Sequence, residues 1–173
     1  MRLLLVDDHE IVRSGLKRLV ENYPEINIVG ECSSGEEAYN FVRKTQVDFV
    51  VMDLSMPGKG GIETTKQIRK HFEDIKILIL SMHDNPTLIK QSLDAGANGF
   101  ILKNDISDDL IKGILSGKVK IEIINDGIVK KAISSSGMGL SGIRERVAQM
   151  KGQIHISSSK FFKIIIFLKH SKK

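Results

Sequence analysis

Short apolar runs that each end in a polar residue restrict the fold of this 173-residue chain more than any other feature. The runs at residues 2–6, 47–52, 76–80 and 99–102 end, in that order, in the pair Asp7-Asp8, in Asp53, in Ser81 and in Lys103. Nearly continuous Val/Ile/Leu runs, each followed by a helix-period stretch, are typical of parallel strands covered on both faces. Because such strands direct their carboxyl ends to the same side of the sheet, we expect the five polar side chains to share one crevice.

The residue types in this crevice indicate phosphoryl chemistry. Carboxylates crowded together, here Asp7, Asp8 and Asp53, repel one another, and a hard divalent cation such as Mg²⁺ relieves that repulsion. A hydroxyl and an ammonium, here Ser81 and Lys103, suit the oxygens of a transferring phosphoryl group. Any one carboxylate alone is better explained as a helix cap or turn residue, but the five residues together favour a phosphoryl site.

Four stretches carry a family resemblance: LLLVDDHEIVRSGL, DFVVMDLSMPGKGGIE, ILILSMHD and AGANGFILKNDISDDLI. With these landmarks, residues 1 to about 117 resemble a response-regulator receiver domain. The resemblance is greatest to the NarL/FixJ type, because no proline follows Lys103. It implies an α/β fold, a doubly wound, flavodoxin-like sheet of five parallel strands.

The resemblance also implies a role for each site residue. It makes Asp53 the phosphoacceptor. Mg²⁺ would be held by Asp8, supported by Asp7, together with Asp53 and the backbone carbonyl of Ser55. The resemblance makes Ser81 the switch hydroxyl, Phe100 the aromatic switch position and Lys103 the phosphate-contacting cation. The family often has Tyr where Phe100 stands, so this chain lacks that hydroxyl. The implied partner is a sensor histidine kinase. The chain is then not an enzyme, but a phosphoacceptor that assists its own phosphorylation and dephosphorylation.

Five βα units can be placed along the first part of the chain. The expected strands are residues 2–6, 26–30, 47–53, 76–81 and 100–102. The first expected helix begins at Asp8 or His9 and the second at Ser33 or Ser34. The other three are expected at residues 62–71, 86–95 and 107–115. This regular alternation predicts right-handed crossovers in a doubly wound sheet. The surface of the fourth and fifth units is where we expect a partner or a second copy to dock, giving a homodimer.

A change in charge marks a second segment after Gly117. Residues 1–117 contain 14 Lys/Arg and 18 Asp/Glu, whereas residues 118–173 contain 12 and 3. The second segment is predicted to form a small α+β appendage without a helix-turn-helix. Its expected elements are a strand at 119–124, a Gly/Ser-rich loop at 126–139, an amphipathic helix at 140–151, and a hairpin of strands at 153–157 and 162–168.

Residues 118–170 resemble the C-terminal half of the ATP-binding domain of a sensor histidine kinase. NDG is similar to the first glycine box of that domain, and GMGLSGIRERV to the second. In the family an Asp that binds the adenine amine stands where this chain has Asn125, and Val129 replaces a glycine. The half of the domain that bears the metal-binding asparagine and the phosphorylated histidine is absent. The segment is therefore expected to be a partial, catalytically silent kinase-like fragment.

Three functional hypotheses follow. The first is a phosphorylation-controlled signalling protein whose output is a protein–protein contact. The second is a nucleotide-binding or histidine-kinase-like protein that uses the C-terminal segment, which the missing boxes disfavour. The third is a DNA-binding transcription regulator that has lost its DNA-binding domain. Because the basic residues of the tail are scattered and form no recognition motif, no sequence-specific nucleic-acid binding is expected.

The sequence also bears on the cellular compartment. Cys32 is the single cysteine, which rules out an intramolecular disulfide and fits a reducing cytosol. The N-terminus reaches Asp7 too soon for a signal peptide. The apolar stretch 161–168 contains Lys163 and is too short to span a bilayer. We therefore expect a cytoplasmic protein with no membrane contact.

Overall fold

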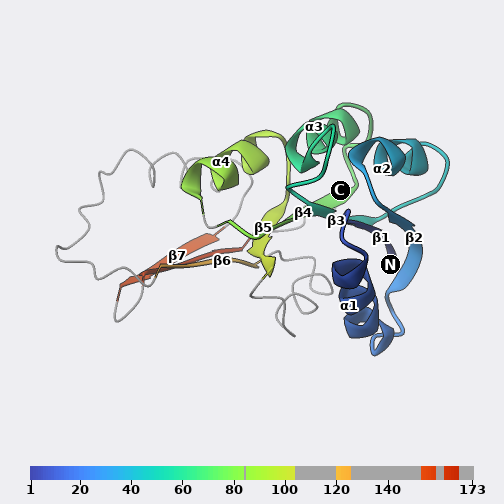
Figure 1. Cartoon of the computed structure of the whole chain (residues 1–173). Coiled ribbons are helices and arrows are strands. Elements are labelled where there is room, and N and C mark those ends of the chain that lie inside the picture. Colours follow the sequence, from blue (N-terminus) through green and yellow to red (C-terminus); the bar gives the residue numbers. More distant parts are fainter. Residues whose placement is uncertain (84, 104–119, 126–152, 159–161, 168–173) are drawn as a thin grey trace.

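A computed structural model describes residues 1–83, 85–103, 120–125, 153–158 and 162–167 (Figure 1). Its main body is a parallel sheet in the order β2-β1-β3-β4-β5. The strands are β1 (Arg2–Val6), β2 (Asn27–Cys32), β3 (Phe49–Asp53), β4 (Lys76–Ser81) and β5 (Gly99–Leu102). The predicted doubly wound, flavodoxin-like fold is confirmed.

Within the described residues, four helices cover this sheet: α1 (Glu10–Glu21), α2 (Gly35–Val42), α3 (Gly61–His71) and α4 (Pro86–Asp94). In Figure 1, α2, α3 and α4 lie over one face and α1 lies over the other. Both faces of the central strands are therefore shielded, and all five residues of β3 are buried. This double burial explains why the strand sequences are continuously apolar rather than alternating.

The helix starts follow the capping signals in the sequence. The Ser34 hydroxyl accepts a hydrogen bond from the backbone N–H of Glu37 at 3.3 Å, and the Glu37 carboxylate accepts one from the backbone N–H of Ser33 at 2.8 Å. At α4, the Asn85 side chain accepts from the N–H of Thr87 at 2.9 Å. These contacts satisfy N–H groups that have no partner within the helix. They confirm Ser34 as the start of α2, one of the two residues predicted for it.

The second strand lies later in the chain than the sequence predicted. Ile26 ends a turn, in which its N–H donates to the carbonyl of Tyr23 at 2.9 Å, so β2 begins at Asn27 and continues to Cys32. The strand is only partly buried, and its register with β1 shifts between Leu3 and Leu4. A partly exposed strand has a weaker hydrophobic pattern, which explains the error in its bounds.

The strand register brings the predicted site residues to the same side of the sheet. Val6 pairs with Met52, Asp53 with Leu80, and Ser81 with Leu102. Asp7, Asp53, Ser81 and Lys103 therefore follow or end neighbouring strands at their carboxyl ends. The chain also reverses its direction of winding between β1 and β3, which is the position where ligands bind in sheets of this kind.

A separate antiparallel sheet follows, with strand order β6-β8-β7. Its strands are β6 (Lys120–Asn125), β7 (Gln153–Ser158) and β8 (Phe162–Phe167), which agree with the three predicted strands to within a residue or so. β7 and β8 pair in antiparallel fashion, as the predicted hairpin requires, and β6 pairs with the other side of β8. The helices expected at 107–115 and 140–151, the loop at 126–139 and the boundary near Gly117 lie outside the described residues. No helix in the described part of the chain is long and apolar enough to cross a membrane.

Gly61 sets the close approach between α3 and the end of β3. A Cβ atom at this position would lie 2.2 Å from the carbonyl oxygen of Asp53. Gly61 also donates its N–H to the carbonyl of Leu54 at 3.0 Å. The first turn of α3 is thus packed directly on the backbone that carries Asp53.

We predict opposite effects for two glycine substitutions. Gly61→Ala should lower the free energy of unfolding by about 1–3 kcal/mol, because the added methyl group overpacks against the Asp53 backbone. Gly15→Ala in α1 should raise it by about 0.5–1 kcal/mol, because the site is open and alanine favours the helix. Urea denaturation measures both. A Gly61→Ala protein as stable as the wild type would contradict this account of the packing.

Candidate functional site

The site is centred on an ammonium group between two buried carboxylates. Lys103 Nζ lies 2.7 Å from Asp7 Oδ2 and 3.0 Å from Asp53 Oδ1. The side chains of both aspartates are 1% exposed, and that of Lys103 is 7% exposed. Three residues that are far apart in sequence therefore form one charged cluster. The structure brings them together as the sequence predicted.

The electrostatics of this cluster favour a bound cation. Burial raises the pKa of the Asp53 carboxyl above its usual value; the contact with Lys103 opposes this rise, and the nearby charge of Asp7 adds to it. For Lys103, burial lowers the pKa, but the contacts with Asp7 and Asp53 outweigh burial, so the pKa lies above its usual value. The ammonium is therefore charged at neutral pH. One positive charge does not balance the carboxylates around it.

Asp8 and His9 complete the group. Asp8 Oδ1 lies 3.0 Å from His9 Nδ1, and ligand atoms of Asp7, Asp8, His9 and Asp53 all lie within 4.8 Å of one another. Asp8 Oδ1 and Asp53 Oδ2 are buried and accept no hydrogen bond. Buried oxygens without a partner carry a free-energy cost that a metal ion would remove. The three carboxylates of this group fit a hard divalent ion such as Mg²⁺.

Ser81 and Phe100 lie where the sequence placed them, at the end of β4 and within β5. The Ser81 hydroxyl donates to the backbone carbonyl of His83 at 3.2 Å and accepts from its N–H at 2.9 Å. Phe100 is 1% exposed. Ser55 lies just beyond β3, and its backbone N–H favours the ionised form of Asp53. Coordination of an ion by the Ser55 carbonyl remains a prediction.

Sequence reasoning missed two contributors to this site. The Arg13 guanidinium donates from Nη1 to the backbone carbonyl of Asp7 at 2.6 Å and so fixes the end of β1 against α1. His9 was expected only as a possible first residue of the helix, although its ring contacts both Asp7 and Asp8. The position of His9 directly after the acidic pair was the only available signal.

With this geometry established, comparison with known proteins identifies the family. The family model described as "Response regulator receiver domain" matches residues 3–115. This chain belongs to that family. The receiver match ends before the second sheet, and the comparisons give no support to the kinase-like resemblance of residues 118–170.

The individual relatives agree with this result. The response regulator UvrY of Escherichia coli K12 is 41% identical over 116 residues, which cover 67% of this chain and 53% of UvrY. A LuxR-family two-component response regulator from an Aurantimonas species has 42% identity and a TM-score of 0.64, and the match covers 66% of this chain and 82% of that one. RcsB of Salmonella enterica serovar Typhimurium has 33% identity and a TM-score of 0.62, with 67% and 97% coverage.

The relatives differ from this chain in length, and one of them binds DNA. The chain spans about half the length of the curated relatives it matches, such as UvrY and NarL of Escherichia coli. The RcsB structure contains a bound promoter, so this relative of the receiver binds DNA. The expectation that this chain makes no sequence-specific contact with nucleic acid therefore finds no support among its relatives.

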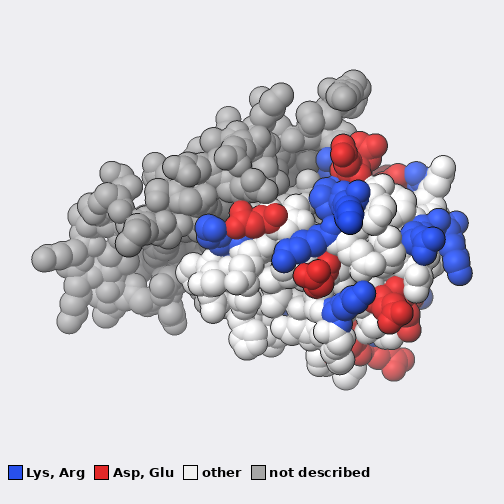
Figure 2. All heavy atoms as spheres, turned by 90° about the horizontal axis from the view of Figure 1, so that it is seen from above, with Lys and Arg blue, Asp and Glu red and all other residues white. Residues whose placement is uncertain are grey.

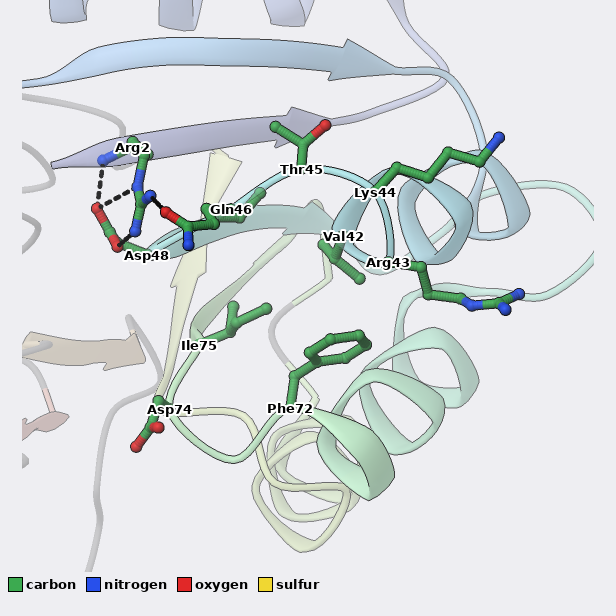
Figure 3. Close-up of a pocket in the computed structure, with 11 residues that line it drawn as sticks. Arg2, Val42, Arg43, Lys44, Thr45, Gln46, Asp48, Phe72, Asp74 and Ile75 are labelled. Atoms are coloured by element: carbon green, nitrogen blue, oxygen red, sulfur yellow. Dashed lines mark hydrogen bonds and ion pairs between the residues drawn. The ribbon is translucent and has the colours of Figure 1, made fainter.

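The receiver also has an open cleft of about 430 Å³ (Figure 3). The cleft lies at the amino ends of the strands, whereas the acidic cluster lies at their carboxyl ends. It is lined at the amino ends of β1, β3 and β4, where Arg2 donates two side-chain hydrogen bonds to Asp48 at 3.2 and 2.6 Å. The apolar side chains Val42, Phe72 and Ile75 form part of its wall. The cleft is thus far from the acidic cluster, and it takes no part in the site.

Figure 2 shows the side of the receiver that carries α2, α3 and α4. Acidic and basic side chains alternate over the described part of this face, with no broad area of one sign. A phosphate backbone is usually bound by a clustered basic surface. The described residues on this side therefore do not form an obvious nucleic-acid interface.

We predict opposite stability effects for two Asp→Asn changes at the two ends of β3. Because the pKa of Asp53 is raised on folding, the folded protein retains a proton on Asp53 at pH values between the unfolded-state and folded-state pKa, where the unfolded chain has already released it. Its free energy of unfolding therefore falls as pH rises from the usual aspartate value through the folded-state pKa. Asp53→Asn removes this titration, so the variant should be more stable than the wild type at pH 7 without metal, by about 1 kcal/mol.

Asp48→Asn is the matched control. The hydrogen bond from Arg2 lowers the pKa of Asp48, so this carboxylate stabilises the protein above its unfolded-state pKa and loses that effect as pH falls through the folded-state value. Asp48→Asn should therefore destabilise the protein at pH 7. Urea denaturation in EDTA between pH 4 and 8 measures both variants. A less stable Asp53→Asn protein at pH 7 would show that contact with Lys103 outweighs the cost of burying the charge.

Proposed function

We propose that this chain is a phosphorylation-controlled response regulator of a two-component system, with Asp53 as the phosphoacceptor. A sensor histidine kinase, or a small phosphodonor, would supply the phosphoryl group. The observation that carries the proposal is the contact of Lys103 with both Asp7 and Asp53 in a nearly solvent-free cluster. A nucleophilic carboxylate beside a fixed ammonium is the arrangement that phosphoryl transfer requires.

The residues also fit the Mg²⁺ that the family implies. Asp8 and Asp53, with Asp7 in support and the backbone carbonyl of Ser55, would hold the ion; the unpartnered oxygens of Asp8 and Asp53 are the supporting observation. When bound, the ion neutralises negative charge on the transferring phosphoryl oxygens.

The chain's own groups then account for the transfer. A carboxylate oxygen of Asp53 attacks phosphorus, the bond from phosphorus to the donor breaks, and an acyl phosphate forms on Asp53. Lys103 offsets the charge of the phosphoryl oxygens, because its ammonium already contacts Asp53. The side chain of Asp53 is buried, so bulk water has little access to the reacting atoms.

The response to phosphorylation would start at Ser81. Its hydroxyl must give up the hydrogen bond that it donates to the His83 carbonyl before it can donate to a phosphoryl oxygen. The movement would leave space that the buried Phe100 ring can fill. Because Phe100 has no hydroxyl, packing rather than a hydrogen bond would report its position. A local change in charge would thus alter the surface of the fourth and fifth βα units.

We propose that the output is a protein–protein contact through this surface, including homodimer formation. The chain would act as a phosphoacceptor that assists its own phosphorylation and dephosphorylation, and not as an enzyme on other substrates. A cytoplasmic location belongs to the same proposal, supported by the buried free thiol of Cys32. The kinase-like alternative, which depends on residues 118–170, is not favoured.

DNA binding is a second candidate output, because one relative has been solved in contact with DNA. RcsB was solved bound to the rprA promoter in the presence of the phosphomimetic BeF3⁻. Non-specific DNA binding, which would not serve as an output, can be told from specific binding: contacts with phosphates weaken steeply between 50 and 200 mM salt, whereas base-specific contacts retain a preferred sequence.

We predict that phosphorylation is confined to Asp53 and requires divalent metal. After incubation with acetyl phosphate and Mg²⁺, intact-mass measurement should show one phosphate adduct, and EDTA should abolish it. Asp53→Asn should not acquire the adduct, whereas Asp48→Asn, at the other end of the same strand, should acquire it normally. An equal adduct on Asp53→Asn would refute the choice of phosphoacceptor.

We further predict that DNA binding by the phosphorylated chain is weak and indifferent to sequence. Fluorescence anisotropy with unrelated duplexes should give similar affinities that fall by about a hundredfold or more when salt rises from 50 to 200 mM. A duplex selected from a random pool that still binds at physiological salt would instead establish DNA control as the output.

A further inference from the structure

His9 lies at the rim of the acidic cluster, at the N-terminal cap of α1. Its side chain is 64% exposed, and its Nδ1 atom lies 3.0 Å from Asp8 Oδ1 and 3.3 Å from Asp7 Oδ1. The imidazole nitrogen and three carboxylate oxygens, from Asp7, Asp8 and Asp53, all lie within 4.8 Å of one another. The cluster therefore offers a nitrogen donor as well as oxygen donors.

The contact between His9 and Asp8 is close, but it is not a hydrogen bond. His9 Nδ1 makes its hydrogen bond with Asp7 Oδ1, which also accepts the backbone N–H of His9 at 2.9 Å. Asp8 Oδ1 is buried and has no hydrogen-bond partner, although the imidazole nitrogen is only 3.0 Å away. Two potential ligand atoms at this distance are well placed to bind one cation from both sides once Nδ1 gives up its hydrogen bond to Asp7.

The spacing of these atoms suits an octahedral ion. Metal–ligand bonds of about 2.1 Å place neighbouring ligands about 3.0 Å apart. The distances from His9 Nδ1 to Asp8 Oδ1 and Asp7 Oδ1, 3.0 and 3.3 Å, are close to this value. Lys103 occupies Asp7 Oδ2 and Asp53 Oδ1, and it does not occupy the buried Asp53 Oδ2. One nitrogen and up to three oxygens therefore remain available.

We propose that His9 Nδ1 is a metal ligand in this receiver and gives the site a preference for first-row transition ions, such as Co²⁺ or Zn²⁺, over Mg²⁺. The inference rests on the proposed metal site and extends it from a site for a hard ion to one that discriminates between ions. Imidazole binds transition ions far better than it binds Mg²⁺, which favours oxygen ligands and retains its water. Because His9 is exposed, its ring is accessible to an ion that arrives from solvent.

The experiment compares Co²⁺ and Mg²⁺ binding to the full-length chain by isothermal titration calorimetry. His9→Asn is the informative variant, because asparagine is a favourable helix cap and places an oxygen near the position of Nδ1. We expect the preference for Co²⁺ over Mg²⁺, taken as the ratio of their dissociation constants, to fall about tenfold or more in this variant. In the wild type, paramagnetic shifts of the His9 ring protons on Co²⁺ binding should report direct coordination.

His71→Asn is the matched control. His71 lies on the exposed side of α3, where its Nδ1 contacts Tyr39 and the backbone carbonyl of Gln67, and it is outside the acidic cluster. Its replacement removes a surface histidine without touching the site, so the ion preference should stay at the wild-type value.

The outcomes separate this inference from the proposed function. If His9→Asn binds Mg²⁺ and retains the wild-type preference for Co²⁺, His9 is not a ligand and the inference is overturned, while the magnesium site stands. If the wild-type chain binds neither ion, both the inference and the proposed metal site are overturned. A fall in the ratio confined to His9→Asn, together with shifted His9 resonances, establishes the nitrogen ligand.

Discussion

The contact of one buried ammonium with two buried carboxylates is the interaction on which the rest of this structure depends. Removing charges from water costs several kcal/mol per ion, and only close pairing with opposite charges offsets that cost. Lys103 contacts Asp7 and Asp53 closely, yet the carboxyl groups at the site outnumber it. Loss of Lys103 would leave those carboxylates unpaired, at a cost of about 3–5 kcal/mol. The fold therefore maintains a local charge imbalance that a cation or a phosphoryl group would alter, and the surrounding packing must hold the carboxylates in place against their repulsion.

That packing is concentrated around the ends of β1 and β3. Arg13 binds the Asp7 carbonyl from α1, and Gly61 allows α3 to lie against the Asp53 carbonyl. On the far side of α3, Arg69 donates to the carbonyl of Gly96 at 3.2 and 3.0 Å and so links α3 to the turn before β5. Each contact joins a helix to the backbone near a site residue. The positions of the charged groups are thus determined by the helices as much as by the strands.

The sequence predicted the part of this arrangement that depends on periodicity and topology. Continuous apolar runs gave the strands, and the rule that parallel strands end on one side of the sheet brought Asp7, Asp53 and Lys103 together correctly. It did not predict contacts that depend on side-chain direction. The hydrogen bond of Arg13 to a backbone carbonyl and the approach of His9 Nδ1 to Asp8 follow from rotamers and helix orientation, which a residue pattern does not contain. The bounds of β2 were wrong because a half-exposed strand lacks a strong pattern.

The position of Lys103 has a mechanical consequence. It follows β5, which pairs only with β4 in the five-stranded sheet, whereas Asp7 follows β1 near the middle of the sheet. The ion pairs therefore link an interior strand of the sheet to the edge strand β5. A phosphoryl group that weakened these ion pairs would act directly on β5, which pairs with β4 in its own sheet and also contacts β6 of the second sheet. A chemical change at the centre of the receiver would thus reach an edge strand that lies against the second sheet.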